Sequence, residues 1–310
     1  MIDVKGDLPN LLLAFPSFAP QVIEPWVEPA PGDPRTVAEI AAAHAAERQQ
    51  GLAAWNIGER DLQAFAQTTR VQVITPGSTA GTPLHVLSSL ENPVASWQRD
   101  PEAARASLSA AVSLLLRLLD RNPDPASSRD HVLLAERRLR AGLPSDLASL
   151  LEDVTRPPVD RIGVLPVDKF LSKRDRADLA AALNTLLASP TFAAWREGIP
   201  LDIATWLTPA NAHDTRTPAI IISVAHLDDD ERTLVLGVLL EEILTWVRSL
   251  PGSKRLRALI VFDEVYGFLP PHPANPPTKR PIVSLMKQAR AFGVGVVIAT
   301  QNPMVSTTGH

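Results

Sequence analysis

Two carboxylates follow an apolar run, at a position where they could do chemistry. Leu259-Ile260-Val261-Phe262 leads directly into Asp263 and Glu264. Such a run predicts a buried strand, and ligands bind beyond the carboxyl ends of parallel strands. A buried carboxylate needs a compensating cation, so a metal-bound phosphate is a natural partner. The alternative is a strand that ends in acidic loop residues. A glycosidase-type pair is less plausible, because neighbouring strand residues point to opposite faces.

A second apolar run ends in polar residues further along the chain. Val296-Val297-Ile298-Ala299 precedes Thr300 and Gln301, and the turn signal Asn302-Pro303 follows. If the two strands are neighbours, Thr300 or Gln301 could hydrogen-bond a γ-phosphate or the attacking water. The alternative is an ordinary exit from a strand into a turn.

The segment between these two strands predicts a helix with one basic side. Its inner face carries Ile282, Leu285 and other apolar residues, whereas Lys287 and Arg290 share the opposite side. These two cations could reach a phosphate on a neighbouring subunit. A solvated basic face is the alternative.

The region from residue 216 onward alternates strands with helices. We expect strands at 219–224, 258–262 and 294–300, and helices at 228–250 and 282–292. Asp228 and Glu231 form a capping-box pattern at the start of the first helix, and Glu241 and Glu242 are expected at its surface or packing edge. This alternation indicates parallel pairing through right-handed crossovers.

The region before residue 216 differs in kind. Residues 8–34 are rich in Pro and predict little regular structure, and strands are expected only at 71–74 and 162–165. Helical periodicity predicts most of the rest, so 35–215 is interpreted as a mostly helical insertion between two parts of one core, 1–34 and 216–310. The expected helices span 35–55, 59–67, 101–121, 129–141, 145–153, 173–188 and 191–197.

Composition limits the classes of function. The 310 residues include no Cys, which excludes disulfides, thiol nucleophiles and iron–sulfur clusters. Lys and Arg number 30 against 34 Asp and Glu, so the net charge of -4 gives no support to nucleic-acid binding. No signal peptide or bilayer-spanning run is present, and we expect a cytoplasmic protein without a membrane partner.

Several segments together resemble the HerA/FtsK superfamily of P-loop motor ATPases. Residues 258–270, Lys287-Gln288-Ala289-Arg290-Ala291-Phe292-Gly293 and 299–303 look like its Walker B and sensor region. Ile2-Asp3-Val4-Lys5-Gly6-Asp7 is similar to its second core strand. Thr75-Pro76-Gly77-Ser78 and Ser223-Val224-Ala225-His226-Leu227 match a HerA-like bacterial subgroup that has a helical insertion. The resemblance implies an α/β fold, namely a P-loop NTPase core of RecA-like (ASCE) type with a parallel sheet.

The resemblance also implies roles for particular residues. Asp263 corresponds to the Walker B Asp that coordinates Mg²⁺, Glu264 to the catalytic Glu, and Gln301, preceded by Thr300, to the polar sensor of the γ-phosphate. Arg290 falls on the basic position of a Gly-Arg-like element, in which Ala289 replaces the Gly. The implied cofactors are ATP and Mg²⁺. The implied partners are DNA, identical subunits in a hexameric ring, and a nuclease, with which some HerA proteins work.

One element of the family is missing from the sequence. No Gly-x-x-x-x-Gly-Lys-Ser/Thr motif, which cradles the β- and γ-phosphates, occurs in the 310 residues. The chain therefore looks like a fragment of a motor ATPase with impaired or no nucleotide binding. In the family's sheet the Ile2 strand, the Walker B strand and the sensor strand lie side by side in that order. Without the strand of the phosphate loop, we expect the sensor strand to form an exposed apolar edge.

Two hypotheses remain open at this stage. The first is a HerA-like ATPase that acts on DNA as a translocase or helicase, with Asp263 on the metal, Glu264 on the water and Gln301 on the γ-phosphate. The second is a non-catalytic interaction protein built on an ATPase-like core. The missing phosphate loop favours the second, whereas the intact Asp263, Glu264 and Gln301 favour the first.

Overall fold

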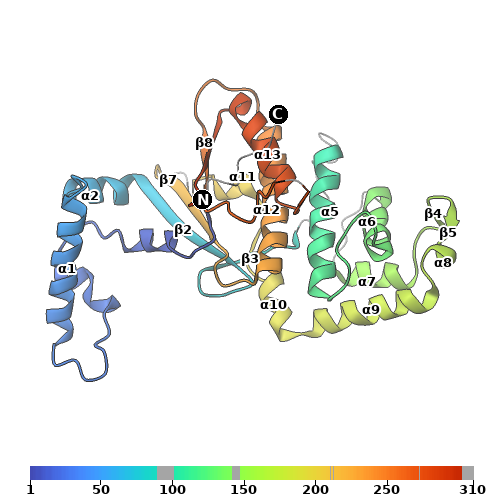
Figure 1. The fold of residues 1–310 in the computed structure, drawn as a ribbon, viewed down its shortest axis with the longest axis horizontal. Helices are drawn as coiled ribbons and strands as arrows, with labels where there is room; N and C mark the ends of the chain where they lie inside the picture. The colour runs from blue at the N-terminus through green and yellow to red at the C-terminus, as the bar shows by residue number, and fades with distance from the viewer. Residues whose placement is uncertain (89–100, 142–146, 210, 212, 272, 302–310) are drawn as a thin grey trace. The chain divides into compact units, whose positions relative to one another are not determined.

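The computed structural model describes residues 1–301 except 89–100, 142–146, 210, 212 and 272 (Figure 1). Its strands form one large sheet and one small one. The strands of the large sheet are β1 (Ile2–Asp3), β2 (Thr69–Pro76), β3 (Thr82–His85), β6 (Ile199–Pro200), β7 (Thr217–Ser223), β8 (Ala258–Asp263) and β9 (Val294–Ile298). The small sheet pairs β4 (Arg161–Ile162) with β5 (Leu165–Pro166).

The large sheet has seven strands in the order β6-β3-β2-β7-β1-β8-β9. Each pairing with a described register, on both sides of β1 and out to β9, is parallel. The predicted α/β fold with a parallel sheet is therefore confirmed. The order β1-β8-β9 with β9 at the edge also confirms the expected position of the strand that precedes Thr300 and Gln301.

Helices make up most of the remaining described chain. They are α1 (Val37–Ala53), α2 (Glu59–Thr68), α5 (Pro101–Leu118), α6 (Arg129–Ala141), α7 (Leu147–Thr155), α8 (Val167–Phe170), α9 (Lys173–Ala188), α10 (Pro190–Arg196), α11 (Ile203–Trp206), α12 (Asp229–Ser249) and α13 (Lys279–Gln288), with short 3-10 turns η1 (Leu8–Leu13), η2 (Pro20–Val22), η3 (Glu24–Trp26) and η4 (Ala289–Phe292). Every helix predicted above has a counterpart among them. No helix of the described residues is long and apolar enough to cross a membrane.

One predicted strand is wrong. Residues 162–165 were expected as a single strand, but Gly163 has a φ of +58° and reverses the chain, so β4 and β5 pair antiparallel. Glycine adopts this left-handed conformation without the steric cost that a side chain brings.

The chain divides into two compact units. The larger, unit 1, contains Met1–Gly6, Val73–Trp206 and the chain from Ile221 onward; unit 2 contains Asp7–Gln72 and Leu207–Ile220. The region 35–215 thus supplies β2, β3 and β6 to the large sheet in addition to its helices. In unit 2 the Pro-rich segment packs Ile23 onto Ala41 and Ala45 of α1.

Helix α12 lies at the centre of unit 1 and packs against both α5 and α13 (Figure 1). It begins with the predicted capping box, in which the Asp228 carboxylate accepts the N–H of Glu231 at 2.7 Å. Its apolar residues face neighbours on nearly all sides and are buried, as the sequence predicts for this helix. Burial of each large apolar side chain contributes about 1.5–3 kcal/mol, so α12 is a main source of this unit's stability.

Candidate functional site

Three polar residues lie side by side at the carboxyl ends of three neighbouring strands. They are Asp3, Asp263 and Ser223, and we call them the aspartate row. In the parallel register Asp3 of β1 is opposite Asp263 of β8 on one side and Ser223 of β7 on the other. Residues directly opposite each other in a sheet project to the same face. The strand order therefore brings two carboxylates and a hydroxyl together at the edge where α/β sheets bind ligands.

Asp3 is fully buried, and only one of its two carboxylate oxygens has a hydrogen-bond partner among the described residues. One carboxylate oxygen accepts the N–H of Gly6 at 2.9 Å, whereas Oδ2 is buried without a hydrogen-bond partner among the described residues. A buried carboxylate oxygen without a donor or cation is costly. Sequence reasoning did not single out Asp3, although the resemblance implied that the Ile2 strand lies beside the Walker B strand. That Asp3 is the residue opposite Asp263 depends on the register between the two strands, which the sequence does not reveal.

Glu264 follows β8 directly and has an unusual backbone conformation. Its φ of +61° lies in the left-handed region, which L residues rarely adopt, so the chain turns sharply here. Its carboxylate accepts the hydroxyl of Thr300 at 2.8 Å and the N–H groups of Gln301 and Tyr266 at 3.2 Å each. Lys5 Nζ adds an ion pair at 3.3 Å. The turn therefore directs Glu264 toward the residues that follow β9.

These contacts stabilise the charged form of the carboxylate. The pKa of Glu264 is lowered, first by the Thr300 hydroxyl and then by the Gln301 and Tyr266 N–H groups and by Lys5, against a raising effect of burial. A carboxylate with a lowered pKa is a weaker base. The arrangement therefore suits the orientation of a water molecule better than its deprotonation.

Removal of the Thr300 hydroxyl is expected to raise the pKa of Glu264 toward its ordinary value, because this hydroxyl is the largest cause of the lowering. Since the folded-state pKa is depressed, the contact stabilises the fold above the unfolded pKa and is lost as the pH falls through the folded one. Thr300→Val should thus lose less stability on acidification. Carbon NMR titration of the carboxyls measures the shift. Thr185→Val, which removes a hydroxyl that donates to Ala181 O within α9, should leave the pKa of Glu264 unchanged.

The structure brings together most of the residues singled out in the sequence. Glu264, Thr300 and Gln301 are in contact, although Gln301 takes part through its backbone N–H. Asp263 lies beside them at the end of β8. Arg290 is exposed on η4, before the amino end of β9, and no described interaction links it to these four residues.

The aspartate row supplies some of the oxygen ligands that a divalent cation such as Mg²⁺ needs. Mg²⁺ prefers carboxylate, hydroxyl and water oxygens, and the unpartnered Oδ2 of Asp3 beside Asp263 is an oxygen that a cation would satisfy. Among the described residues no group of three or more His, Cys, Asp or Glu side chains is placed to hold a metal. Asp3 and Asp263 are the two carboxylates that would hold a cation here, and Mg²⁺ is commonly bound by one or two carboxylates together with water and phosphate oxygens.

Comparison with protein-family models gave no match, and comparison with curated proteins gave none either.

Proposed function

We propose that this chain carries the metal-binding and water-orienting residues of a HerA-like motor ATPase. One observation supports this most directly: Glu264 at the end of β8 contacts Thr300 and Gln301, which lie 36 and 37 residues further along the chain. An acidic residue joined to polar residues of the adjacent strand, beside an aspartate row, suits the hydrolysis of a metal-bound phosphate. A surface loop of acidic residues would not need these contacts.

In this proposal each residue has a separate task. Asp263 and Asp3 would hold Mg²⁺, which would neutralise charge on the phosphate oxygens. Glu264 accepts a hydrogen bond from the attacking water, and Thr300 and Lys5 keep its carboxylate charged and oriented. Gln301 extends toward the γ-phosphate. The proposal also includes DNA as the substrate, a hexameric ring and a nuclease partner. These three rest only on the resemblance to the HerA/FtsK superfamily.

Replacement of Asp263 by Asn tests the metal site. We expect the variant to bind Mn²⁺, a spectroscopic substitute for Mg²⁺, about 10-fold more weakly, because a neutral amide replaces a charged ligand. Electron paramagnetic resonance of free Mn²⁺ gives the Kd. Asp178→Asn, on the exposed side of α9, makes the same chemical change away from the row and should have no effect. Equal Kd values for Asp263→Asn and the unchanged chain would refute the metal site.

A non-catalytic interaction protein is the second candidate, favoured by the lack of a Gly-x-x-x-x-Gly-Lys-Ser/Thr motif in the 310 residues. For the same reason we expect the 310-residue chain alone to bind Mg²⁺-ATP weakly or not at all. Calorimetric titration measures this, and micromolar affinity would contradict it. Mn²⁺ binding that Asp263→Asn leaves unchanged would favour this second candidate.

A further inference from the structure

A cavity of about 900 Å³ lies between helices α5 and α12 and the loop that precedes α13. Residues 102–117 of α5 supply one wall, and the opposite wall comes from α12 and from Asn275, Pro276 and Pro277. We call this the α5–α12 cavity. All of its lining residues belong to unit 1, and none of them is in the aspartate row or has a described contact with Glu264. Its volume suits a small molecule.

The two helices run antiparallel along the cavity (Figure 1). Arg117, near the end of α5, donates to the carboxylate of Asp230, near the start of α12, at 2.7 Å. Glu102, at the start of α5, therefore lies at the same end of the cavity as Glu241. Asp124, in the turn after α5, belongs to the Asp230 end. Asp230 and Glu241 are about three turns of α12 apart, or about 16 Å, so the cavity has carboxylates at both of its ends.

The lining of this cavity has an excess of negative charge. Four lining residues are acidic, namely Glu102, Asp124, Asp230 and Glu241, and two are basic, namely Arg117 and Arg280. Each arginine already pairs with a lining carboxylate, Arg117 with Asp230 at 2.7 Å and Arg280 with Glu241 at 2.8 Å. Glu102 and Asp124 have no ion pair with a described residue. A positively charged ligand would supply the missing cations.

Glu241 is the buried part of this lining, with 4% of its surface exposed. Its Oε2 accepts a hydrogen bond from Arg280 at 2.8 Å, whereas no described residue donates to Oε1. Burial raises the pKa of Glu241, against the charge and hydrogen bond of Arg280 and the charge of Arg248. A buried carboxylate oxygen without a donor is costly, and a cationic N–H group in the cavity would satisfy it.

The acidic residues are spread along the cavity and are not gathered at one point. Among the described residues no three His, Cys, Asp or Glu side chains are placed to hold a metal ion, so a compact cation is a poor match. Between the two ends the lining is small or apolar, with Ala106, Ala110, Leu234, Pro276 and Pro277. A chain of methylene groups with positive nitrogens at its ends matches both features.

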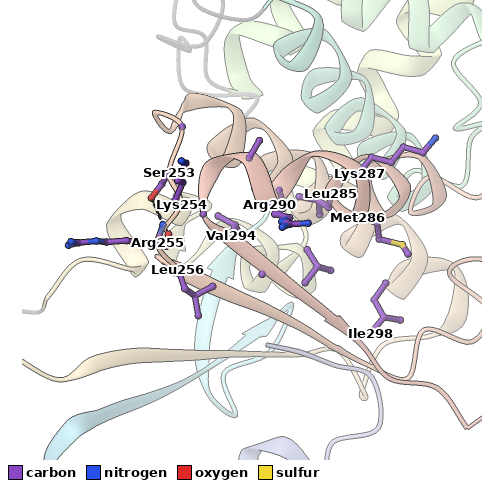
Figure 2. A pocket seen from close by; sticks show the side chains of 16 residues that line it. Ser253, Lys254, Arg255, Leu256, Leu285, Met286, Lys287, Arg290, Val294 and Ile298 are labelled. Carbon is purple, nitrogen blue, oxygen red and sulfur yellow. Dashed lines mark hydrogen bonds between the residues drawn. The ribbon is translucent and has the colours of Figure 1, made fainter.

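Charge separates this cavity from the groove beside β9 (Figure 2). That groove has no acidic lining residue and carries four basic ones, Lys254, Arg255, Lys287 and Arg290. A cationic ligand would be repelled there, so its binding can be assigned to the α5–α12 cavity by replacing the acidic residues.

We propose that the α5–α12 cavity binds a linear aliphatic polyamine, with ammonium groups at Glu241 and Glu102 at one end and at Asp124 and Asp230 at the other. The methylene groups between them would pack against the alanines and prolines of the lining. A nucleotide would bring its phosphates against these carboxylates and is disfavoured by repulsion. No lining residue takes part in the proposed hydrolysis of ATP, so this proposal stands independently of it.

Polyamines of different length test the proposal on the 310-residue chain. We expect isothermal titration calorimetry to show saturable binding of spermine, a long tetra-amine. Putrescine, a short diamine that reaches only one end of the cavity, should bind about 10-fold more weakly. No saturable binding of spermine, or an equal Kd for the two amines, would overturn the proposal.

Variants of the chain locate the binding. Glu241→Gln and Asp124→Asn, one at each end, should each weaken spermine binding about 10-fold. The same changes outside the cavity, Glu242→Gln on α12 and Asp178→Asn on α9, should not. Glu241→Gln keeps an acceptor for the hydrogen bond of Arg280, and circular dichroism checks the fold of each variant. If Glu241→Gln and Glu242→Gln have the same Kd for spermine, the amine does not bind in this cavity and the proposal is wrong.

Discussion

Replacement of Gly293 by Ala is expected to lower the free energy of unfolding by about 3 kcal/mol. Gly293 joins η4 to β9 with a φ of +76°. An added Cβ would overlap the carbonyl oxygen of Arg255 and lie 3.0 Å from Cβ of Ser253. The cost has two parts: a left-handed conformation at a residue with a side chain, about 1–2 kcal/mol, and overlap with backbone that cannot rotate away, about 1–3 kcal/mol.

The backbone around Gly293 leaves little room for relaxation. Its carbonyl accepts the N–H of Arg257 at 2.7 Å, and the N–H of Ser253 donates to Ala291 O at 3.0 Å. These bonds fasten the segment before β8 to the turn before β9. An added methyl group therefore has to move β8 and β9 apart or break these hydrogen bonds. Glu264 and Thr300 follow directly after these two strands.

Two other glycines separate the parts of this cost. Gly267 has a similar φ of +86° but open space around an added Cβ, so Gly267→Ala should cost only about 1–2 kcal/mol. At Gly252 the added Cβ would be 3.6 Å from Ala291 O, an ordinary contact, so Gly252→Ala should change stability little. Urea denaturation measures all three. If Gly293→Ala costs no more than Gly267→Ala, the overlap with Arg255 is relieved by movement and the prediction is wrong.

The contacts of Glu264 show what the sequence could predict about the site. Apolar runs at 258–262 and 294–300 predict two strands, and parallel strands place their carboxyl ends at one edge. From this alone Asp263 and Glu264 are expected near Thr300 and Gln301. The prediction that both strands are buried is wrong, because Leu259 and Val297 are exposed and most of the other residues are half-buried. The left-handed φ of Glu264 has no signal in the sequence, because Glu is not a residue that favours this conformation. Without that turn the carboxylate's contacts with Lys5 and Tyr266 could not be foreseen.

The short strands show where prediction from sequence ends. Long helices such as α9 and α12 have enough residues for their periodicity to be recognised, and their bounds agree closely with the prediction. By contrast β3 has four residues and β6 has two, and neither contains a periodic pattern. They form strands because each pairs with a neighbouring strand, β3 with β2 and β6 with β3. This pairing is a property of the tertiary structure. Strand β1 also has only two residues and was expected through the resemblance, not from a periodic pattern; its register places Asp3 beside Asp263.

Glu241 is a residue whose environment the sequence did not predict. Two adjacent glutamates in α12 were expected at its surface or packing edge, but Glu241 is buried and its Oε2 lies 2.8 Å from Nη2 of Arg280 on α13. Burial raises the pKa of Glu241, and the charge and hydrogen bond of Arg280 oppose that rise. The pair thus connects two helices that border the same core.

Replacement of Arg280 by Met is expected to lower the free energy of unfolding by about 2 kcal/mol at pH 7, because it leaves the buried Glu241 carboxylate without its hydrogen-bonded cation and with only the weaker charge interaction of Arg248. Loss of one partner of a fully buried pair costs about 3–5 kcal/mol, and the smaller figure is used because the Arg280 side chain is 47% exposed and screened by water. Urea denaturation of this variant and the unchanged chain measures the difference.

The pH dependence of this cost identifies its cause. Without Arg280 the folded-state pKa of Glu241 lies further above its unfolded value, so the carboxyl binds its proton more tightly in the folded chain. The stability it contributes is then present below the unfolded pKa and is lost as the pH rises through the folded pKa. Arg280→Met should therefore differ little from the unchanged chain in acid and increasingly as the pH rises. A cost that depended only on lost packing of the Arg280 stem would be the same at every pH.

A double variant separates the charge from the contact surface. In Glu241→Gln/Arg280→Met the buried group is neutral, so most of the 2 kcal/mol or so should return and the pH dependence should disappear. Glu241→Gln alone should be nearly neutral, because an amide can still accept the hydrogen bond of Arg280 and avoids the desolvation that raises the carboxyl pKa. If the double variant is as unstable as Arg280→Met, the unpaired charge is not what destabilises α12 against α13. The stem of Arg280 would then hold the two helices together by packing.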